Sequence, residues 1–240
     1  MSNAQSFTLF CIPCAGSSSA MYNAWDDELL EGVQINKIEL AGRGRRFSVP
    51  LKRDYVSAVE DAYSQLPAIL PARFAIFGHS MGGLLAYGIC QKLLADNRTL
   101  PEYVFISACA SPTNRNQSRF ESLESKQALI NDLKSQGGTP KEVFSHPDLL
   151  EIVIRIFSAD ISICRSFKYE QNHKLPIHFE IIAGRDDAIT AAEKSAWADI
   201  SSYPINETWF EGGHFYLQEH KKALLKHISH TLKKPVAIAS

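Results

Sequence analysis

Short apolar runs alternate with amphipathic segments along most of the chain. The runs are rich in β-branched and aromatic residues, as in strands that a parallel sheet buries on both faces. We predict strands at residues 8–12, 33–40, 73–77, 103–108, 177–183 and 206–210. Apolar residues at helical spacing predict helices at residues 55–66 and 81–94. The alternation therefore predicts an α/β fold, with a mostly parallel central sheet flanked by helices.

This alternation stops between about residues 112 and 171. Residues 123–133 and 149–163 have helical patterns, a Gly-Gly-Thr-Pro break lies at 137–140, and no strand pattern intervenes. A helical insertion adds nothing to the sheet, and long insertions often cover an active site. We therefore expect one domain, residues 1–240, with a helical lid insertion at about 112–171 rather than a decorative excursion.

The composition narrows the class of protein. The 240 residues, 45% of them hydrophobic, suffice for a full core. The chain has 25 Lys and Arg against 26 Asp and Glu, a net charge of -1. It therefore lacks the excess of basic residues that is typical of nucleic-acid-binding proteins. No apolar run reaches the roughly 18–20 residues of a membrane span, and the start of the chain lacks the pattern of a signal peptide. The sequence predicts a cytoplasmic protein without a nucleic-acid or membrane partner.

The five cysteines fit reduced thiols, since their number is odd and no export signal precedes them. Cys11 and Cys14 have the spacing of a redox C-x-x-C pair. In thioredoxin-type sites such a pair begins a helix, whereas Cys11 lies inside a predicted strand. Packing is therefore the favoured role of Cys11, and no second pair of cysteines or histidines has the spacing of a metal site.

Residues 78–82 read Gly-His-Ser-Met-Gly, which matches the G-x-S-x-G motif of a nucleophile elbow. A predicted strand leads into the motif and a predicted helix leads out of it, as the motif requires. The glycines leave room for a sharp turn that raises the Ser80 hydroxyl above the sheet, at the positive end of the helix. Ser80 is the predicted nucleophile, and the adjacent His79 is expected to pack rather than to transfer a proton.

A serine becomes a good nucleophile when a base and an acid assist it, and after this motif the acid precedes the histidine in the chain. The predicted strand at 177–183 is followed by Gly-Arg-Asp-Asp, and the strand at 206–210 by Glu-Gly-Gly-His. Both segments follow carboxyl ends of strands, where open α/β sheets bind ligands. His214 is the predicted base. Asp187 is the predicted acid by its spacing from the glycine, and Asp186 is the open alternative.

Two backbone N–H groups are expected to form an oxyanion hole. One belongs to Met81, the residue after the nucleophile. The second should come from the loop after an early strand, and residues 13–17 (Pro-Cys-Ala-Gly-Ser) form such a loop of small residues. Ala15 is the predicted donor, with Cys14 as the alternative.

Taken together, these motifs resemble the type II (external) thioesterases of polyketide and nonribosomal peptide biosynthesis. Further matching positions are Phe10, Pro13, Gly16, Tyr22, Trp25, Gly42, Arg43, Gly44, Arg46, Gly83, Ala159, Asp160, Tyr169, Trp197, Phe215 and Tyr216. The resemblance covers nearly the full length. Position 14 is often His in that family and is Cys here, and Ser158 stands where an Arg often precedes Ala-Asp.

The resemblance implies an α/β-hydrolase with a helical lid that releases acyl groups from the phosphopantetheine arm of carrier proteins. It implies Ser80, Asp187 and His214 as the catalytic triad, and it favours a monomer. A thioester is electrophilic enough for this triad, so we expect neither a metal nor an organic cofactor.

Two other functions remain open. One is a hydrolase of free small esters or acyl-coenzyme A with the same triad. The other is an inactive hydrolase fold that serves as a binding module, although the presence of all three triad residues disfavours it. A carrier protein is acidic, so a basic cluster could bind it; a solvated face is the favoured interpretation of that cluster. The cluster consists of Arg43, Arg45, Arg46, Lys52 and Arg53.

Overall fold

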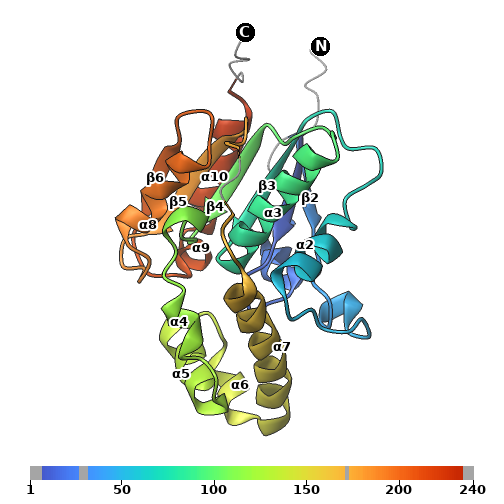
Figure 1. Cartoon of the computed structure of the whole chain (residues 1–240). Helices are drawn as coiled ribbons and strands as arrows, with labels where there is room; N and C mark the ends of the chain where they lie inside the picture. Colours follow the sequence, from blue (N-terminus) through green and yellow to red (C-terminus); the bar gives the residue numbers. More distant parts are fainter. Residues whose placement is uncertain (1–6, 27–31, 171–172, 235–240) are drawn as a thin grey trace.

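The central sheet has six parallel strands. The structure is a computed structural model that describes residues 7–26, 32–170 and 173–234 (Figure 1). The strand order is β2-β1-β3-β4-β5-β6, and every neighbouring pair is parallel. The strands are β1 (Phe7–Ile12), β2 (Val33–Lys37), β3 (Phe74–His79), β4 (Tyr103–Ser107), β5 (His178–Gly184) and β6 (Asn206–Phe210). The predicted α/β fold and the six predicted strands are confirmed.

Helices cover both faces of the sheet, and each face has its own apolar core. One core joins the sheet to α2, α3, α5 and α7, and the other joins it to α1, α9 and α10. The α-helices are α1 (Asn23–Asp26), α2 (Tyr55–Tyr63), α3 (Met81–Ala95), α4 (Ser118–Glu121), α5 (Lys126–Gln136), α6 (Lys141–Ser145), α7 (Pro147–Ser166), α8 (Ala191–Ser195), α9 (Tyr216–Glu219) and α10 (Lys221–Leu232). Short 3₁₀ turns are η1 (Ser19–Tyr22), η2 (Gly44–Arg46), η3 (Pro112–Asn114) and η4 (Ala196–Asp199).

Two predicted elements, the strand at 33–40 and the helix at 55–66, end three residues earlier in the structure than predicted. Strand β2 stops at Lys37 instead of residue 40, because its partner β1 ends one register position later, at Ile12. Ile38 and Leu40 are still buried, so they pack in the apolar core although they lie beyond the pairing of β2 with β1. Helix α2 ends at Tyr63, and tight turns complete the segment to Leu66.

The segment from η3 to α7 is helical, and between residues 112 and 170 no strand interrupts it. The predicted helices at 123–133 and 149–163 correspond to α5 and α7, with ends shifted by up to three residues. Figure 1 shows α4, α5, α6 and α7 gathered beyond one end of the sheet. The end of α7 contacts α2, where the Ser166 hydroxyl accepts a hydrogen bond from the Tyr55 N–H at 2.7 Å.

A buried ion pair ties α7 to the loops at the end of the sheet. The Arg43 guanidinium binds both carboxylate oxygens of Asp160, at 2.6 and 2.7 Å, and the side chains are only 4% and 0% exposed. The oxygen of the first of these contacts, Oδ2, also accepts a hydrogen bond from the Gly16 N–H at 2.7 Å. The same guanidinium donates to the Ser17 carbonyl at 3.1 Å. Asp160 thereby connects the helical segment to the loop after β1.

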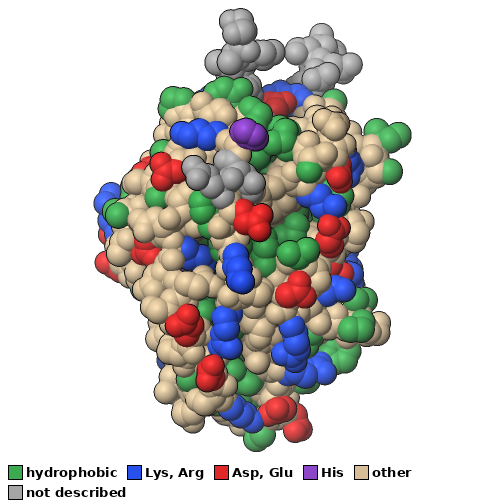
Figure 2. Space-filling view, in the orientation of Figure 1, with side chains coloured by type: hydrophobic (Ala, Val, Ile, Leu, Met, Phe, Trp, Pro, Cys, Tyr) green, Lys and Arg blue, Asp and Glu red, His purple; other side chains and the backbone are tan. Residues whose placement is uncertain are grey.

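These contacts correct the sequence-based interpretation of the basic cluster. Arg43 is not part of a solvated face, and the Arg46 guanidinium binds the Asp61 carboxylate at 2.6 and 2.7 Å. Arg45 and Arg53 remain exposed. On the face in Figure 2, cationic and acidic side chains are interspersed over the helical segment instead of being gathered by sign.

All five cysteines are buried and unpaired, and Cys11 lies in β1 as predicted. Burial raises the pKa of Cys14 to about 11, so this thiol is protonated at neutral pH. None of the helices in the described ranges has both the length and the apolar character needed to span a membrane.

Replacing Asp160 with Asn would leave the Arg43 charge buried without its carboxylate. Because breaking one side of a buried pair costs about 3–5 kcal/mol, D160N should lower the free energy of unfolding by about that amount in urea denaturation. The control is Glu151, which pairs with Lys126 at the surface with both side chains more than half exposed. E151Q should change the free energy of unfolding by less than about 1 kcal/mol. Equal effects of the two substitutions would contradict a stabilising role of the buried pair.

Candidate active site

The turn between β3 and α3 holds Ser80 in a strained conformation. Its φ is 54° and its ψ is -117°, a backbone conformation that residues other than glycine rarely adopt. The Ser80 N–H donates to the Ser107 carbonyl at 2.8 Å and fixes the turn to β4. A Cβ at Gly78 would lie 2.2 Å from the Gly82 carbonyl oxygen, and one at Gly82 would lie 2.2 Å from that of Ile12. Only glycines at these two positions allow the backbone to turn this sharply, as the motif predicted.

Asp187 and His214 meet at the ends of β5 and β6. The His214 Nδ1 lies 3.1 and 3.2 Å from the two carboxylate oxygens of Asp187, and the side chains are 8% and 1% exposed. A Cβ at Gly184 would lie 2.2 Å from the Gly213 carbonyl oxygen, so a glycine there lets the two loops approach. The neighbouring Asp186 is exposed, and its carboxylate makes no hydrogen bond within the described part of the chain. Of the two candidate acids, Asp187 is therefore the one that contacts the histidine.

The surroundings of Asp187 keep it ionised. Burial by itself would raise the pKa of this carboxyl, but the hydrogen bond from His214 and the charges of His214 and Lys194 outweigh burial. The Ile189 N–H also donates to Oδ1 at 3.3 Å. The pKa of Asp187 consequently lies below its usual range, and a carboxylate faces the imidazole at neutral pH.

The other nitrogen of His214, Nε2, has no hydrogen-bond partner among the described residues, although it is buried. The His214 ring lies beside that of His79, with centroids 5.2 Å apart, and His79 directly precedes Ser80. The Ser80 hydroxyl is likewise without a hydrogen bond in the described ranges. A buried unpaired nitrogen is costly in a native structure and points to a functional role.

His79 belongs to a separate hydrogen-bonded chain. Its Nδ1 lies 2.9 Å from the Ser107 hydroxyl, which in turn lies 2.6 Å from the Tyr216 hydroxyl. Burial, followed by the neighbouring His214, lowers the pKa of His79 well below its usual range. A permanently neutral imidazole at this position fits a packing role beside the serine.

The candidate oxyanion donors come from two separate segments that line the cavity of Ser80. Met81 is the first residue of α3, and the first N–H groups of a helix have no partner within it. Ala15 lines the same cavity as Ser80, whereas Cys14 does not. The Ala15 N–H is therefore better placed than that of Cys14 to bind an oxyanion. The next residue, Gly16, has a φ of +76° and donates to Asp160, which holds this loop in place.

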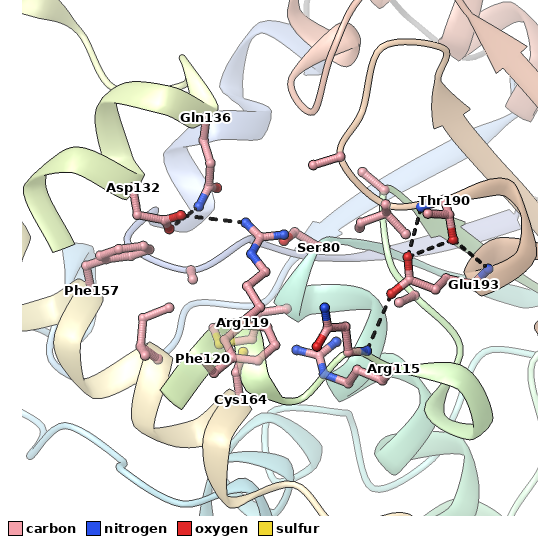
Figure 3. A pocket seen from close by; sticks show the side chains of 18 residues that line it. Ser80, Arg115, Arg119, Phe120, Asp132, Gln136, Phe157, Cys164, Thr190 and Glu193 are labelled. Atoms are coloured by element: carbon pink, nitrogen blue, oxygen red, sulfur yellow. Dashed lines mark hydrogen bonds and ion pairs between the residues drawn. The ribbon is translucent and has the colours of Figure 1, made fainter. Parts of the chain in front are cut away.

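A cavity of about 330 Å³ adjoins Ser80 (Figure 3). The walls come from the elbow, from the loop that contains Ala15, and from the helical segment, which supplies Phe120 and Phe157. A second cavity of about 340 Å³ adjoins Asp187 and His214. Both are lined by the same three polar side chains of α4 and α5: Arg119, Asp132 and Gln136.

These polar lining residues were missed by the sequence analysis, as was the link between Asp160 and Arg43. No motif marks arginines on short helices, because their place in a cavity depends on how the helical segment packs. In the described residues no cluster of three or more His, Cys, Asp or Glu side chains could hold a metal ion.

Comparisons with known proteins agree in the type of enzyme. The family model for the thioesterase domain matches residues 7–232. The medium-chain S-acyl fatty acid synthase thioesterase of Rattus norvegicus is 28% identical over 218 residues, which are 89% of this chain and 82% of that protein. The gramicidin S biosynthesis protein GrsT of Aneurinibacillus migulanus is 25% identical over 99% of this chain and 93% of its own length.

Solved structures show the same similarity. ClbQ from the colibactin nonribosomal peptide and polyketide synthase pathway superposes with a TM-score of 0.88 at 27% identity, over 95% of this chain and 97% of ClbQ. BorB, a type II thioesterase from the borrelidin biosynthetic cluster, has a TM-score of 0.86 at 27% identity, over 97% and 95% of the two chains. With its parallel sheet and an elbow at Ser80, the chain belongs to the thioesterase domain family of the α/β-hydrolase fold.

Proposed function

We propose that this protein is a type II thioesterase that hydrolyses acyl groups from the phosphopantetheine arm of carrier proteins in polyketide or nonribosomal peptide synthesis. Ser80, His214 and Asp187 form its catalytic triad. The observation that carries this assignment is the buried Asp187–His214 pair, which leaves one imidazole nitrogen without a hydrogen-bond partner among the described residues, beside the strained serine turn.

In the first half of the reaction the acyl group moves to the enzyme. The His214 Nε2 removes the Ser80 proton as the hydroxyl oxygen attacks the thioester carbonyl. Asp187 holds the imidazole in the required tautomer and stabilises the imidazolium. The carbonyl oxygen becomes an oxyanion, which the N–H groups of Met81 and Ala15 stabilise. The carbon–sulfur bond then breaks, and the thiol leaves with the proton from His214.

In the second half, water takes the place of the thiol. His214 removes a proton from the water, whose oxygen attacks the acyl-serine carbonyl through a second oxyanion. Collapse of this intermediate releases the carboxylic acid and returns the proton to Ser80. Sulfur donates electrons poorly into the carbonyl, so a thioester is electrophilic enough for the triad without further activation.

The helical segment from η3 to α7 serves as a lid over this site. Its residues line the cavity beside Ser80 opposite the elbow, and the Arg43–Asp160 pair fastens it to the loop of Ala15. Walls of Phe120 and Phe157 would shield the acyl-enzyme from bulk water. We assign the whole chain to one domain that contains this lid at about residues 112–171.

An acylated carrier protein is the proposed partner, and the protein acts as a cytoplasmic monomer. Three similar proteins support the substrate class: ClbQ comes from a nonribosomal peptide and polyketide synthase pathway, BorB is a type II thioesterase of a biosynthetic cluster, and the rat relative is an S-acyl fatty acid synthase thioesterase. The competing function is hydrolysis of free small esters or acyl-coenzyme A by the same triad.

The substrate class can be tested by comparing kcat/KM for one acyl group on a carrier protein, on coenzyme A and as a nitrophenyl ester. We expect the acyl-carrier protein to be preferred at least about tenfold, equivalent to 1.4 kcal/mol in the transition state. The reason is that the carrier adds binding energy that the small esters lack. A preference for the nitrophenyl ester would contradict the carrier assignment while leaving the triad intact.

Ser80→Ala removes the nucleophile. Hydrolysis of acyl-carrier protein should fall by about 10⁴–10⁶-fold, as when a triad serine is lost elsewhere. The circular dichroism spectrum and the thermal unfolding should remain those of a folded protein, since Ser80 makes no side-chain hydrogen bond in the described ranges. Turnover at the wild-type rate would rule out Ser80 as the nucleophile.

Asp187→Asn and Asp186→Asn form a matched pair that distinguishes the two candidate acids. In D187N an amide would face the His214 Nδ1 and favour the tautomer with a protonated Nε2, so kcat should fall by about 10³–10⁴-fold at neutral pH. D186N changes an exposed carboxylate without a bond to the histidine, and its kcat should match that of the wild type. The reverse order of effects would assign the acid to Asp186.

A further inference from the structure

The cavity beside Ser80 contains two arginines that a purely hydrocarbon acyl chain would not require. Arg115 follows η3 and Arg119 lies in α4, and both line the cavity. Figure 3 shows the Arg119 side chain extending between Asp132 and Ser80, with Arg115 near Phe120 and Cys164. The remaining wall is largely apolar, with Ala108, Phe157 and Ile161 among its residues.

The acidic side chains of this wall do not neutralise the arginines through hydrogen bonds. The Glu193 carboxylate accepts bonds from the Thr190 N–H and hydroxyl at 2.9 and 2.8 Å, and from the Asn116 N–H at 3.4 Å. The bond from the Thr190 N–H belongs to the capping box of α8, in which the Glu193 N–H donates to the Thr190 hydroxyl at 3.2 Å. The Asp132 carboxylate accepts a bond from the Gln136 amide at 2.5 Å. Glu193 is thus committed to the cap of α8, whereas Asp132 also forms a long ion pair with Arg119 without a hydrogen bond to it.

The guanidinium groups of Arg115 and Arg119 make fewer hydrogen bonds than these two carboxylates do. The nearest Arg119 nitrogen lies 3.8 Å from Asp132 Oδ1, and Arg119 donates no hydrogen bond among the described residues. The Arg115 guanidinium lies over the Phe120 ring at 4.4 Å, and its buried Nε has no hydrogen-bond partner in the same ranges. The adjacent Cys164 is no counter-ion, because burial raises its pKa to about 11. A buried N–H without a partner, such as the Arg115 Nε, is costly unless a ligand accepts from it. The Arg119 side chain is 33% exposed and has N–H groups available to a ligand in the cavity that it lines.

A carboxylate suits a pair of arginines, because it accepts two parallel charge-assisted hydrogen bonds from one guanidinium and keeps lone pairs for the second. The phosphate of the carrier arm has the same sign of charge, but the whole pantetheine separates it from the thioester. A cavity against the nucleophile therefore receives the acyl group. At about 330 Å³ the cavity is at the small end of ligand sites, which run from roughly 300 to 1,000 Å³.

We infer that the preferred substrate carries a short dicarboxylic acyl group, joined to the arm through one carbonyl and ending in a free carboxylate that binds Arg115 and Arg119. This inference rests on the proposed function and names its substrate class. The apolar wall takes the methylene groups between the two carbonyl carbons.

The inference is tested with pantetheine thioesters that lack the phosphate, so that the acyl group is the only source of an anion. Glutaryl and pentanoyl thioesters have equal carbon chains and differ in the terminal carboxylate. Wild-type kcat/KM should favour the glutaryl thioester by about tenfold or more, and R115M and R119M should each reduce this preference by about tenfold. Met retains most of the side-chain bulk, and R115K should retain part of the preference because it keeps the charge.

Arg155 provides the matched control. It lies on α7 in the same helical segment, is exposed, stacks over Phe47 at 5.5 Å and does not line the cavity. R155M should leave both rates and their ratio at the wild-type values. Thermal unfolding of all variants identifies any that fail to fold.

Several outcomes would overturn the inference. It is wrong if the wild type prefers the pentanoyl thioester, or if R115M and R119M slow both substrates equally; the proposed function would then still stand. It is also wrong if the arginine variants weaken binding of phosphopantetheine but not of the glutaryl group, which would assign the arginines to the phosphate.

If the wild type hydrolyses neither thioester, calorimetry with free glutarate and pentanoate decides the inference, while the acyl-carrier protein assay decides the proposed function separately. Glutarate binding that R115M abolishes would support the carboxylate site, and absence of glutarate binding to the wild type would overturn it.

Discussion

The sharp turn at Ser80 is the constraint on which the site depends. Two close backbone approaches hold it: Gly78 against Gly82, and Gly82 against the carbonyl of Ile12. The second contact joins the start of α3 to the end of β1, so the turn also fixes the loop that contains Ala15. The strain of the turn is balanced by packing in the sheet, where β3 is buried along its whole length.

Two buried side-chain pairs complete the arrangement by joining segments distant in sequence. Asp187 and His214 are 27 residues apart, and Arg43 and Asp160 are 117 residues apart. The first pair orients an imidazole beside the serine. The second attaches the helical segment to the loop after β1. A buried pair with good geometry tolerates little displacement, because separation leaves a desolvated polar group without its partner. The first pair therefore couples the loops after β5 and β6, and the contacts of Asp160 couple α7 to the loops after β1 and β2.

Much of the architecture was predictable from local patterns. The buried strands have nearly continuous apolar character, and the elbow motif has a strand before it and a helix after it, so the fold class and the candidate nucleophile followed directly. Prediction was less successful for residues that are buried outside a strand or helix, because their burial does not follow from a local pattern. Ile38 and Leu40 are apolar because the core covers them, although the ladder of β2 has already ended. Arg43 was grouped with exposed arginines, since charge along a sequence does not reveal a partner 117 residues away.

The amino-acid sequence by itself determined the order of strands and helices, the glycine-lined turn at Ser80 and the two loops that bear the acid and the histidine. These features depend on neighbours within a few residues, through side-chain periodicity and backbone sterics. The choice of Asp187 over Asp186 as the partner of His214, and the place of Arg115 and Arg119 beside the serine, were decided only by the tertiary structure. Both depend on distances between side chains from separate elements, which are set by the packing of the whole chain.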